Sequence, residues 1–155
     1  DPFFFFFSKD NLDLSIKGIG LLPIKTIFLE NKITRQIKCE SIWPKSTKIN
    51  GYEIHNGLTE LDRSQDTLKI KPIFKNLDLG WYKENSRGGT IAGTYIHGIF
   101  ENDEWRDNYI NLIRKGKNLA SLNKKTRSYK IKRESIIDNL ANEFNKNFNI
   151  SSLLN

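Results

Sequence analysis

The sequence predicts an α/β or α+β domain in which several strands are followed by two C-terminal helices. Two observations predict this class. Short apolar runs of strand length fill the first two-thirds of the chain, and after Phe100 the period of the apolar residues changes from about two to about 3.6. The 155 residues contain no internal repeat and no Pro-rich or Ser-rich linker. Residues 1–155 are therefore expected to form a single unit.

The expected strands are five apolar runs separated by turn-forming residues, at 19–22, 26–29, 34–42, 51–58 and 90–96. Before the last run, the segment 85–89 (NSRGG) concentrates residues that accept a positive φ or bond their own backbone. We therefore expect a tight turn there, which leads into the strand at Thr90 as one arm of a hairpin.

The first expected helix has an apolar face from Trp105 to Ile113, an N-cap at Asn102 or Asp103, and a stop at Gly116. A second helix is expected over 133–148, where isoleucine, leucine and phenylalanine form an apolar stripe. The basic stretch 124–132 is then an exposed connector before it.

Charge and hydropathy indicate a cytoplasmic protein with no membrane segment. The net charge of +7 raises the question of nucleic acid, but the basic residues are spread along the chain, so no nucleic-acid role is expected. The aromatic run 3–7 is too short for a signal peptide, and no stretch approaches the ~20 apolar residues of a membrane span. Because the chain contains no methionine, we expect that other sequence precedes it.

The sequence offers little for metal or cofactor binding. Cys39 is the single cysteine, so it can form no internal disulfide, and its alternating surroundings indicate a strand cysteine without chemical importance. The chain has neither a cluster with metal-ligand spacing nor a phosphate-binding loop of the GxxxxGK[ST] type. We therefore expect no metal and no cofactor in this segment.

The two histidines are the candidate catalytic residues. His55 and His97 both lie in glycine-flanked segments at the ends of apolar runs. A lone histidine more often packs or bonds locally, but His97 follows the strand 90–96, and in open α/β sheets the carboxyl ends of strands are where sites form.

Three segments, 18–23 (GIGLLP), 51–57 (GYEIHNG) and 93–100 (GTYIHGIF), together resemble the C-terminal half of the cobyric acid synthase family. The resemblance extends to the dipeptide at 1–2 and to the segment 136–141 (IIDNLA), so it covers effectively the whole chain. It implies the C-terminal part of a class I glutamine amidotransferase domain with a flavodoxin-like fold. The synthetase domain and the nucleophile segment would lie upstream and are absent here.

The resemblance also implies the reaction. Glutamine is hydrolysed at a cysteine, and the ammonia amidates carboxylates b, d, e and g of adenosylcobyrinic acid a,c-diamide in the synthetase domain, which would hold ATP and Mg²⁺. Glutamine and this corrin are the implied partners of the full-length enzyme in cobalamin biosynthesis. Without the nucleophile, we expect the chain alone to have no glutaminase activity.

His97 matches the family's catalytic histidine, whose imidazole would hold the cysteine as a thiolate and later donate the proton that lets ammonia leave. In many class I amidotransferases a glutamate two residues later orients this ring. Here that position is Ile99, as is usual for this branch, so the base uses another acceptor or works in a dyad. Glu53 and His55 share one face of a strand and are either substrate-guiding or structural.

Two alternatives stay open. The chain could belong to another cobyrinate-type amidotransferase that acts on different carboxylates. It could also be a non-catalytic basic module that binds nucleic acid, which would account for the charge but not for the glycine-framed histidines. Salt-dependent retention on DNA or RNA would distinguish this last alternative.

Overall fold

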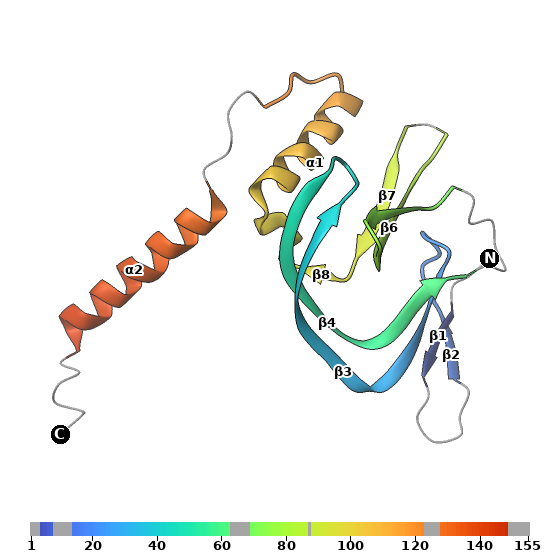
Figure 1. Cartoon of the computed structure of the whole chain (residues 1–155), viewed down its shortest axis with the longest axis horizontal. Helices are drawn as coiled ribbons and strands as arrows, with labels where there is room; N and C mark the ends of the chain where they lie inside the picture. Colours follow the sequence, from blue (N-terminus) through green and yellow to red (C-terminus); the bar gives the residue numbers. More distant parts are fainter. Residues whose placement is uncertain (1–3, 8–13, 63–68, 87, 123–127, 149–155) are drawn as a thin grey trace.

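The computed structural model describes residues 4–7, 14–62, 69–86, 88–122 and 128–148. Within them, strands are followed by two helices, which confirms the expected order (Figure 1). The strands are β1 Phe4–Phe7, β2 Leu14–Lys17, β3 Ile24–Ser41, β4 Thr47–Leu61, β5 Lys71–Phe74, β6 Leu77–Glu84, β7 Thr90–Thr94 and β8 Ile96–His97. The helices are the single-turn η1 Ile99–Glu101, then α1 Asp103–Gly116 and α2 Tyr129–Asn147.

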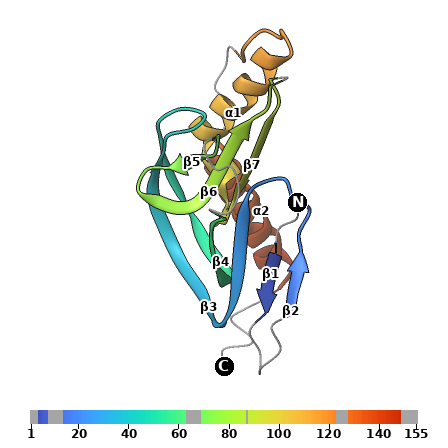
Figure 2. The ribbon, with the colours of Figure 1, turned by 90° about the vertical axis from the view of Figure 1, so that its right-hand side faces the viewer.

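The described strands form one sheet in the order β2-β1-β3-β5-β6-β7, with β4 also paired to β3 and β8 to β4. The α/β class is confirmed, and parallel pairing is limited among these strands to β1 with β3. In the side view, β1 and β2 lie beside β3 at the end of the molecule away from α1 (Figure 2). The site-bearing strands β4 and β8 are thus joined to the rest of the sheet through β3.

The long hairpin of β3 and β4 is the main structural element. Its register runs from Ile24 opposite Leu61 to Ser41 opposite Thr47, with a shift between Phe28 and Ile33. The runs 26–29 and 34–42 were expected as separate strands. Except for Ile42, they lie in one continuous strand, because the polar residues between them stay extended across the register shift. The strand expected at 19–22 is wrong, since the chain bends there and β3 begins after Pro23.

The expected hairpin before Thr90 is confirmed as the pair β6 and β7. Asn85 closes the turn: its backbone N–H donates to the Gly89 carbonyl at 2.8 Å, and its Oδ1 accepts from the Gly89 N–H at 2.7 Å. The sequence analysis did not predict β5 or β6, whose charged and aromatic residues interrupt the apolar alternation. The expected strand 90–96 is two strands, because β7 pairs with β6 and β8 with β4.

Helix α1 has the predicted bounds, with Asn102 at the N-cap position. The Asn102 side chain binds β4 instead of capping the helix: Oδ1 accepts from the Asn50 N–H at 2.8 Å and Nδ2 donates to the Asn50 carbonyl at 2.9 Å. Helix α2 begins at Tyr129, four residues before the predicted start at Arg133, so 129–132 are helical and not a connector. The Tyr129 N–H at this start donates to Oδ1 of Asp103 at 2.9 Å. Neither described helix is long and apolar enough to cross a membrane.

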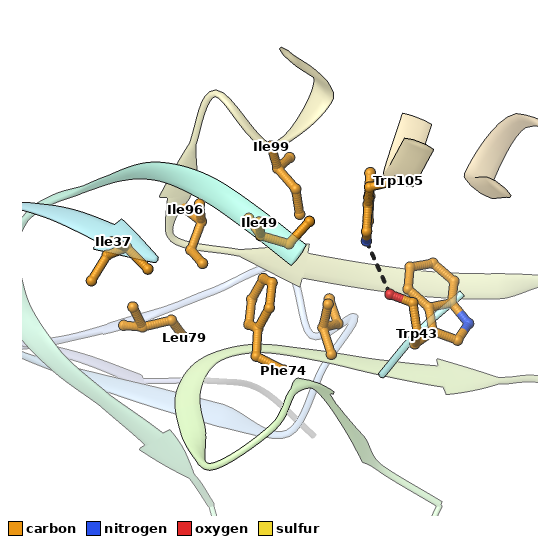
Figure 3. Packing of buried hydrophobic residues seen from close by; sticks show 9 residues of the cluster. Ile37, Trp43, Ile49, Phe74, Leu79, Ile96, Ile99 and Trp105 are labelled. Carbon is orange, nitrogen blue, oxygen red and sulfur yellow. Dashed lines mark hydrogen bonds between the residues drawn. The ribbon is translucent and has the colours of Figure 1, made fainter. Parts of the chain in front are cut away.

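The core lies between the β3–β4 hairpin, the β5–β6 hairpin and α1, as Figure 3 shows. Trp105 of α1 is buried and donates its indole N–H to the Trp43 carbonyl at 3.0 Å, which joins the helix to the end of β3. No described side chain of α2 is buried, and the apolar stripe expected on this helix is exposed. Figure 1 shows α2 extending away from the sheet.

Candidate active site

His97 lies in the short strand β8, at an edge of the described part of the sheet. Among the described strands β8 pairs with β4 alone, and His97 is opposite Tyr52. The imidazole is exposed, and its Nδ1 lies 3.1 Å from the Tyr95 carbonyl oxygen. Because a carbonyl oxygen only accepts, Nδ1 carries the hydrogen, and Nε2 of the neutral ring keeps its lone pair. Nε2 is therefore the nitrogen that can take a proton from a neighbouring group.

Two glycines allow the backbone path around His97. A Cβ at Gly51 would lie 2.6 Å from both the His97 carbonyl oxygen and Cγ2 of Ile96, so only glycine lets β4 approach β8 this closely. Gly98 has φ 77, in the left-handed region that glycine adopts without steric cost. It turns the chain from β8 into η1 and then into α1.

A cavity of about 250 Å³ is lined by residues next to His97, although not by His97 itself. Its lining includes Tyr52, the partner of His97 across the two strands, and Gly98, which follows His97. Glu101 and Arg133 line it as an ion pair with an N–O distance of 3.2 Å, so α2 contributes to the wall. This volume is below the roughly 300–1,000 Å³ of pockets for drug-sized ligands, so it suits a smaller molecule.

Glu53 and His55 form a second group on β4. The Glu53 side chain is buried, with the residue only 2% exposed. Its Oε2 accepts from Arg35 Nε at 2.5 Å, and its Oε1 accepts from His55 Nε2 at 2.8 Å. Both carboxylate oxygens thus have donors, as a buried charge requires. Nδ1 of His55 is buried and has no hydrogen-bond partner among the described residues.

Tyr95 connects the two groups. Its ring packs against the His55 imidazole with centroids 4.7 Å apart, and its carbonyl oxygen accepts from His97. Its hydroxyl accepts from Thr59 Oγ1 at 2.7 Å and lies 3.3 Å from Thr26 Oγ1. Glu53 and His55 therefore lie together, whereas His97, opposite Tyr52, lies on the other face of the β4–β8 pair and is connected to them through Tyr95, which the sequence analysis did not name as a site residue.

Cys39 lies in β3 opposite Ile49 and packs against the core. Burial raises the pKa of its thiol, which disfavours the nucleophilic thiolate. No group of three or more His, Cys, Asp or Glu side chains in the described parts of the chain is placed to hold a metal ion. His97 is thus the described side chain best placed for acid–base chemistry at the edge of the sheet.

The sequence analysis missed Arg35, Tyr95, Thr26 and Thr59. Arg35 is directly opposite Glu53, and Thr26 directly opposite Thr59, in the β3–β4 register. The two pairs lie on either side of the register shift between Phe28 and Ile33, so the sequence alone does not reveal both. Tyr95 lies in the segment 93–100, two residues before His97. This proximity to the candidate base was the feature of the sequence that could have indicated Tyr95 as a site residue.

The described chain is thus a sheet followed by two helices, with an exposed histidine at a sheet edge. The family model of the CobB/CobQ-like glutamine amidotransferase domain matches residues 8–105, which include both histidines. The chain belongs to this family of glutamine amidotransferase domains.

Similar proteins carry the name cobyric acid synthase. One from Prochlorococcus marinus subsp. pastoris is 77% identical over 155 residues, which are 100% of this chain and 30% of that protein. A second, from Prochlorococcus marinus strain MIT 9515, is 74% identical over all of this chain and 31% of its own length. A third, from Synechococcus sp. strain CC9311, is 38% identical over 89% of this chain and 28% of its own. The chain thus spans about 30% of the length of these relatives.

Proposed function

We propose that this chain is the C-terminal part of a cobyric acid synthase and supplies the histidine half of its glutaminase site. The complete enzyme would transfer glutamine-derived ammonia to carboxylates b, d, e and g of adenosylcobyrinic acid a,c-diamide at the expense of ATP, in the cytoplasm. The proposal is supported by the identity over the whole chain to proteins of that name and by the family match. ATP, Mg²⁺ and the corrin would bind in other parts of the enzyme.

One observation carries the catalytic assignment: Nδ1 of His97 donates to a carbonyl oxygen, so Nε2 of this exposed residue keeps the lone pair that can accept a proton. In the proposed reaction Nε2 takes the proton of a cysteine thiol from another part of the enzyme. The thiolate attacks the carboxamide carbon of glutamine, and His97 returns the proton to the departing ammonia. Water then hydrolyses the thioester to glutamate and the free thiol.

We propose that glutamine approaches His97 through the cavity lined by Tyr52, Gly98, Glu101 and Arg133, because Tyr52 is opposite His97 and Gly98 follows it. Its paired charges could meet the ammonium and carboxylate groups of an amino acid. We assign Glu53 and His55 a structural or substrate-guiding role, because Glu53 is buried and already has two donors.

The test is His97→Asn in the full-length enzyme, assayed with glutamine and then with ammonium as the nitrogen source. General acid–base catalysis contributes about 10²- to 10⁴-fold, so the glutamine-dependent rate should fall by at least about a hundredfold. Amidation driven by ammonium should persist, because that chemistry belongs to the synthetase domain. Unchanged glutamine-dependent amidation would show that the assignment is wrong, and equal loss with both nitrogen sources would show that His97 supports the fold.

A further inference from the structure

The chain changes strand partners at Tyr95, and this change places the Tyr95 carbonyl beside His97. Up to Thr94 the chain pairs with β6, and from Ile96 it pairs with β4. Thr94 fixes the change with its side chain, because Oγ1 donates to the Leu79 carbonyl at 2.8 Å and accepts from the Ile96 N–H at 3.0 Å. The Tyr95 N–H also donates to the Leu79 carbonyl, at 2.8 Å.

The Tyr95 side chain is held at its far end by two buried hydroxyl groups. Thr26 and Thr59 are 6% and 7% exposed, and their Oγ1 atoms lie 2.7 Å apart. Thr59 donates to the Tyr95 hydroxyl at 2.7 Å. A hydroxyl buried in such a group has little freedom, since each lost hydrogen bond would leave a desolvated polar atom.

The Tyr95 ring packs against the tilted imidazole of His55, which is itself fixed by its hydrogen bond to Glu53. The residue two positions after His97 supplies no polar group: Ile99 is 5% exposed and belongs to the core. Among the described residues, the hydrogen bond of the His97 ring is the one to the Tyr95 carbonyl.

We propose that Tyr95 is the positioning residue for His97. Its hydroxyl and ring fix the backbone at 95, and its carbonyl oxygen keeps the hydrogen on Nδ1 of His97, so that Nε2 stays free to accept a proton. This inference rests on the proposed catalytic role of His97. The backbone carbonyl of Tyr95, anchored through the hydroxyl groups of Thr26 and Thr59, then sets the orientation of the His97 ring.

The first test is Tyr95→Phe in the full-length enzyme, which removes the hydroxyl and keeps the ring. Loss of a hydrogen bond of this kind should lower kcat with glutamine by roughly three- to tenfold, with little change in KM. The ammonium-dependent rate should be unchanged. Thr59→Val removes the donor to the Tyr95 hydroxyl while keeping the shape of the side chain, and it should also lower kcat with glutamine. This variant replaces Tyr95→Phe as the test if Tyr95→Phe does not fold.

Tyr82→Phe is the matched control, because Tyr82 is a partly buried tyrosine stacked on Trp43, outside the hydroxyl cluster. It should keep the wild-type kcat. The inference is wrong if Tyr95→Phe and Thr59→Val keep the wild-type kcat with glutamine, or if Tyr82→Phe lowers it as much as they do.

The second test measures the tautomer directly by ¹⁵N NMR of the enzyme labelled at histidine, with the His97 signals assigned by their absence in His97→Asn. The wild type should show a protonated Nδ1 and a bare Nε2, and Tyr95→Phe should show a mixture of tautomers. A protonated Nε2 in the neutral wild-type ring would overturn the inference. This readout does not depend on catalysis, so failure of the proposed function, seen as unchanged activity of His97→Asn, is distinguished from failure of the positioning role.

Discussion

Glu53 is a carboxylate almost completely removed from water, and its two partners make that burial tolerable. Arg35 reaches it from β3 and His55 from two residues along β4. Burying a charge is costly unless donors replace the lost water, and removal of one partner leaves an uncompensated oxygen. The group Arg35–Glu53–His55 therefore links the stability of the β3–β4 hairpin to the ring contact of Tyr95.

For His55→Ala in the full-length enzyme, we expect a loss of stability with measurable glutamine hydrolysis retained. The substitution removes one donor to Glu53 and the ring that packs on Tyr95. The free energy of unfolding should fall by about 1–3 kcal/mol, the usual effect of leaving a buried acceptor without its partner. Thermal denaturation and glutaminase assays measure the two quantities.

Asn56→Ala is the control for this experiment, because Asn56 is the exposed neighbour of His55 on the same strand. It should leave both quantities near the wild-type values. Complete loss of glutaminase activity in His55→Ala with unchanged thermal stability would contradict the structural role and make His55 a second candidate base.

At the residue scale, the sequence offered candidate site residues but not the contacts that hold them. His97, Glu53 and His55 were found because glycines and apolar runs frame them. Thr26 and Tyr95 are 69 positions apart, and nothing local in the sequence indicates that their hydroxyl groups meet. Contacts of this kind depend on the register of the sheet, which a single sequence does not specify.

The two helices are joined through Asp103 at the start of α1, which accepts from the Tyr129 N–H at the start of α2. This hydrogen bond, with smaller contributions from Ser128 and Arg106, lowers the pKa of the Asp103 carboxyl. A lowered pKa means that the contact stabilises the charged form. The stabilisation from this contact is therefore fully present above the ordinary pKa of 3.8 and is lost as pH falls below that value.

We predict that Asp103→Ala frees the first turn of α2. At neutral pH the protection of the Tyr129 amide against hydrogen exchange should fall, because its acceptor is gone, and in the wild type the same loss should occur in acid below pH 3.8. Glu104→Ala is the matched control, since it removes a charge from the same turn of α1 but not the acceptor. Equal loss of protection in both variants would show that the charge of that turn, and not the contact, holds α2.

At the element scale, the helices were easier to predict than the strands. Helix α1 is specified locally, by its apolar spacing and by the acidic residues of its first turn, whereas Gly116, the predicted stop, is its last helical residue. The start of α2 was placed too late because Tyr129 obtains its hydrogen-bond acceptor from another helix. Strand β3 was divided in two, and β5 and β6 were missed, because strand pairing tolerates charged residues that interrupt the local alternation.

For the whole molecule, the burial pattern predicts that stability resides in the sheet and α1. Trp105→Ala should lower the free energy of unfolding of this chain by about 3–5 kcal/mol, because it empties a buried site and removes the bond to the Trp43 carbonyl. Leu140→Ala on α2 should change it by less than about 0.5 kcal/mol, because Leu140 is 70% exposed. Urea denaturation followed by tryptophan fluorescence and circular dichroism measures both changes. Similar losses in the two variants would show that α2 unfolds together with the core.

The residues that hold the candidate site are far apart in the sequence, and this separation affects the order of folding. β3 and β4 pair across the short connection 42–46, whereas Tyr95 reaches Thr59 over 36 positions and Thr26 over 69. Closing long loops costs more entropy, so contacts between distant segments tend to form after local ones. We therefore expect the hairpin to be present in the folding transition state and the docking of Tyr95 to follow it. A chain trapped short of that last step would have most of its secondary structure, but its His97 imidazole would not yet be held in one tautomer.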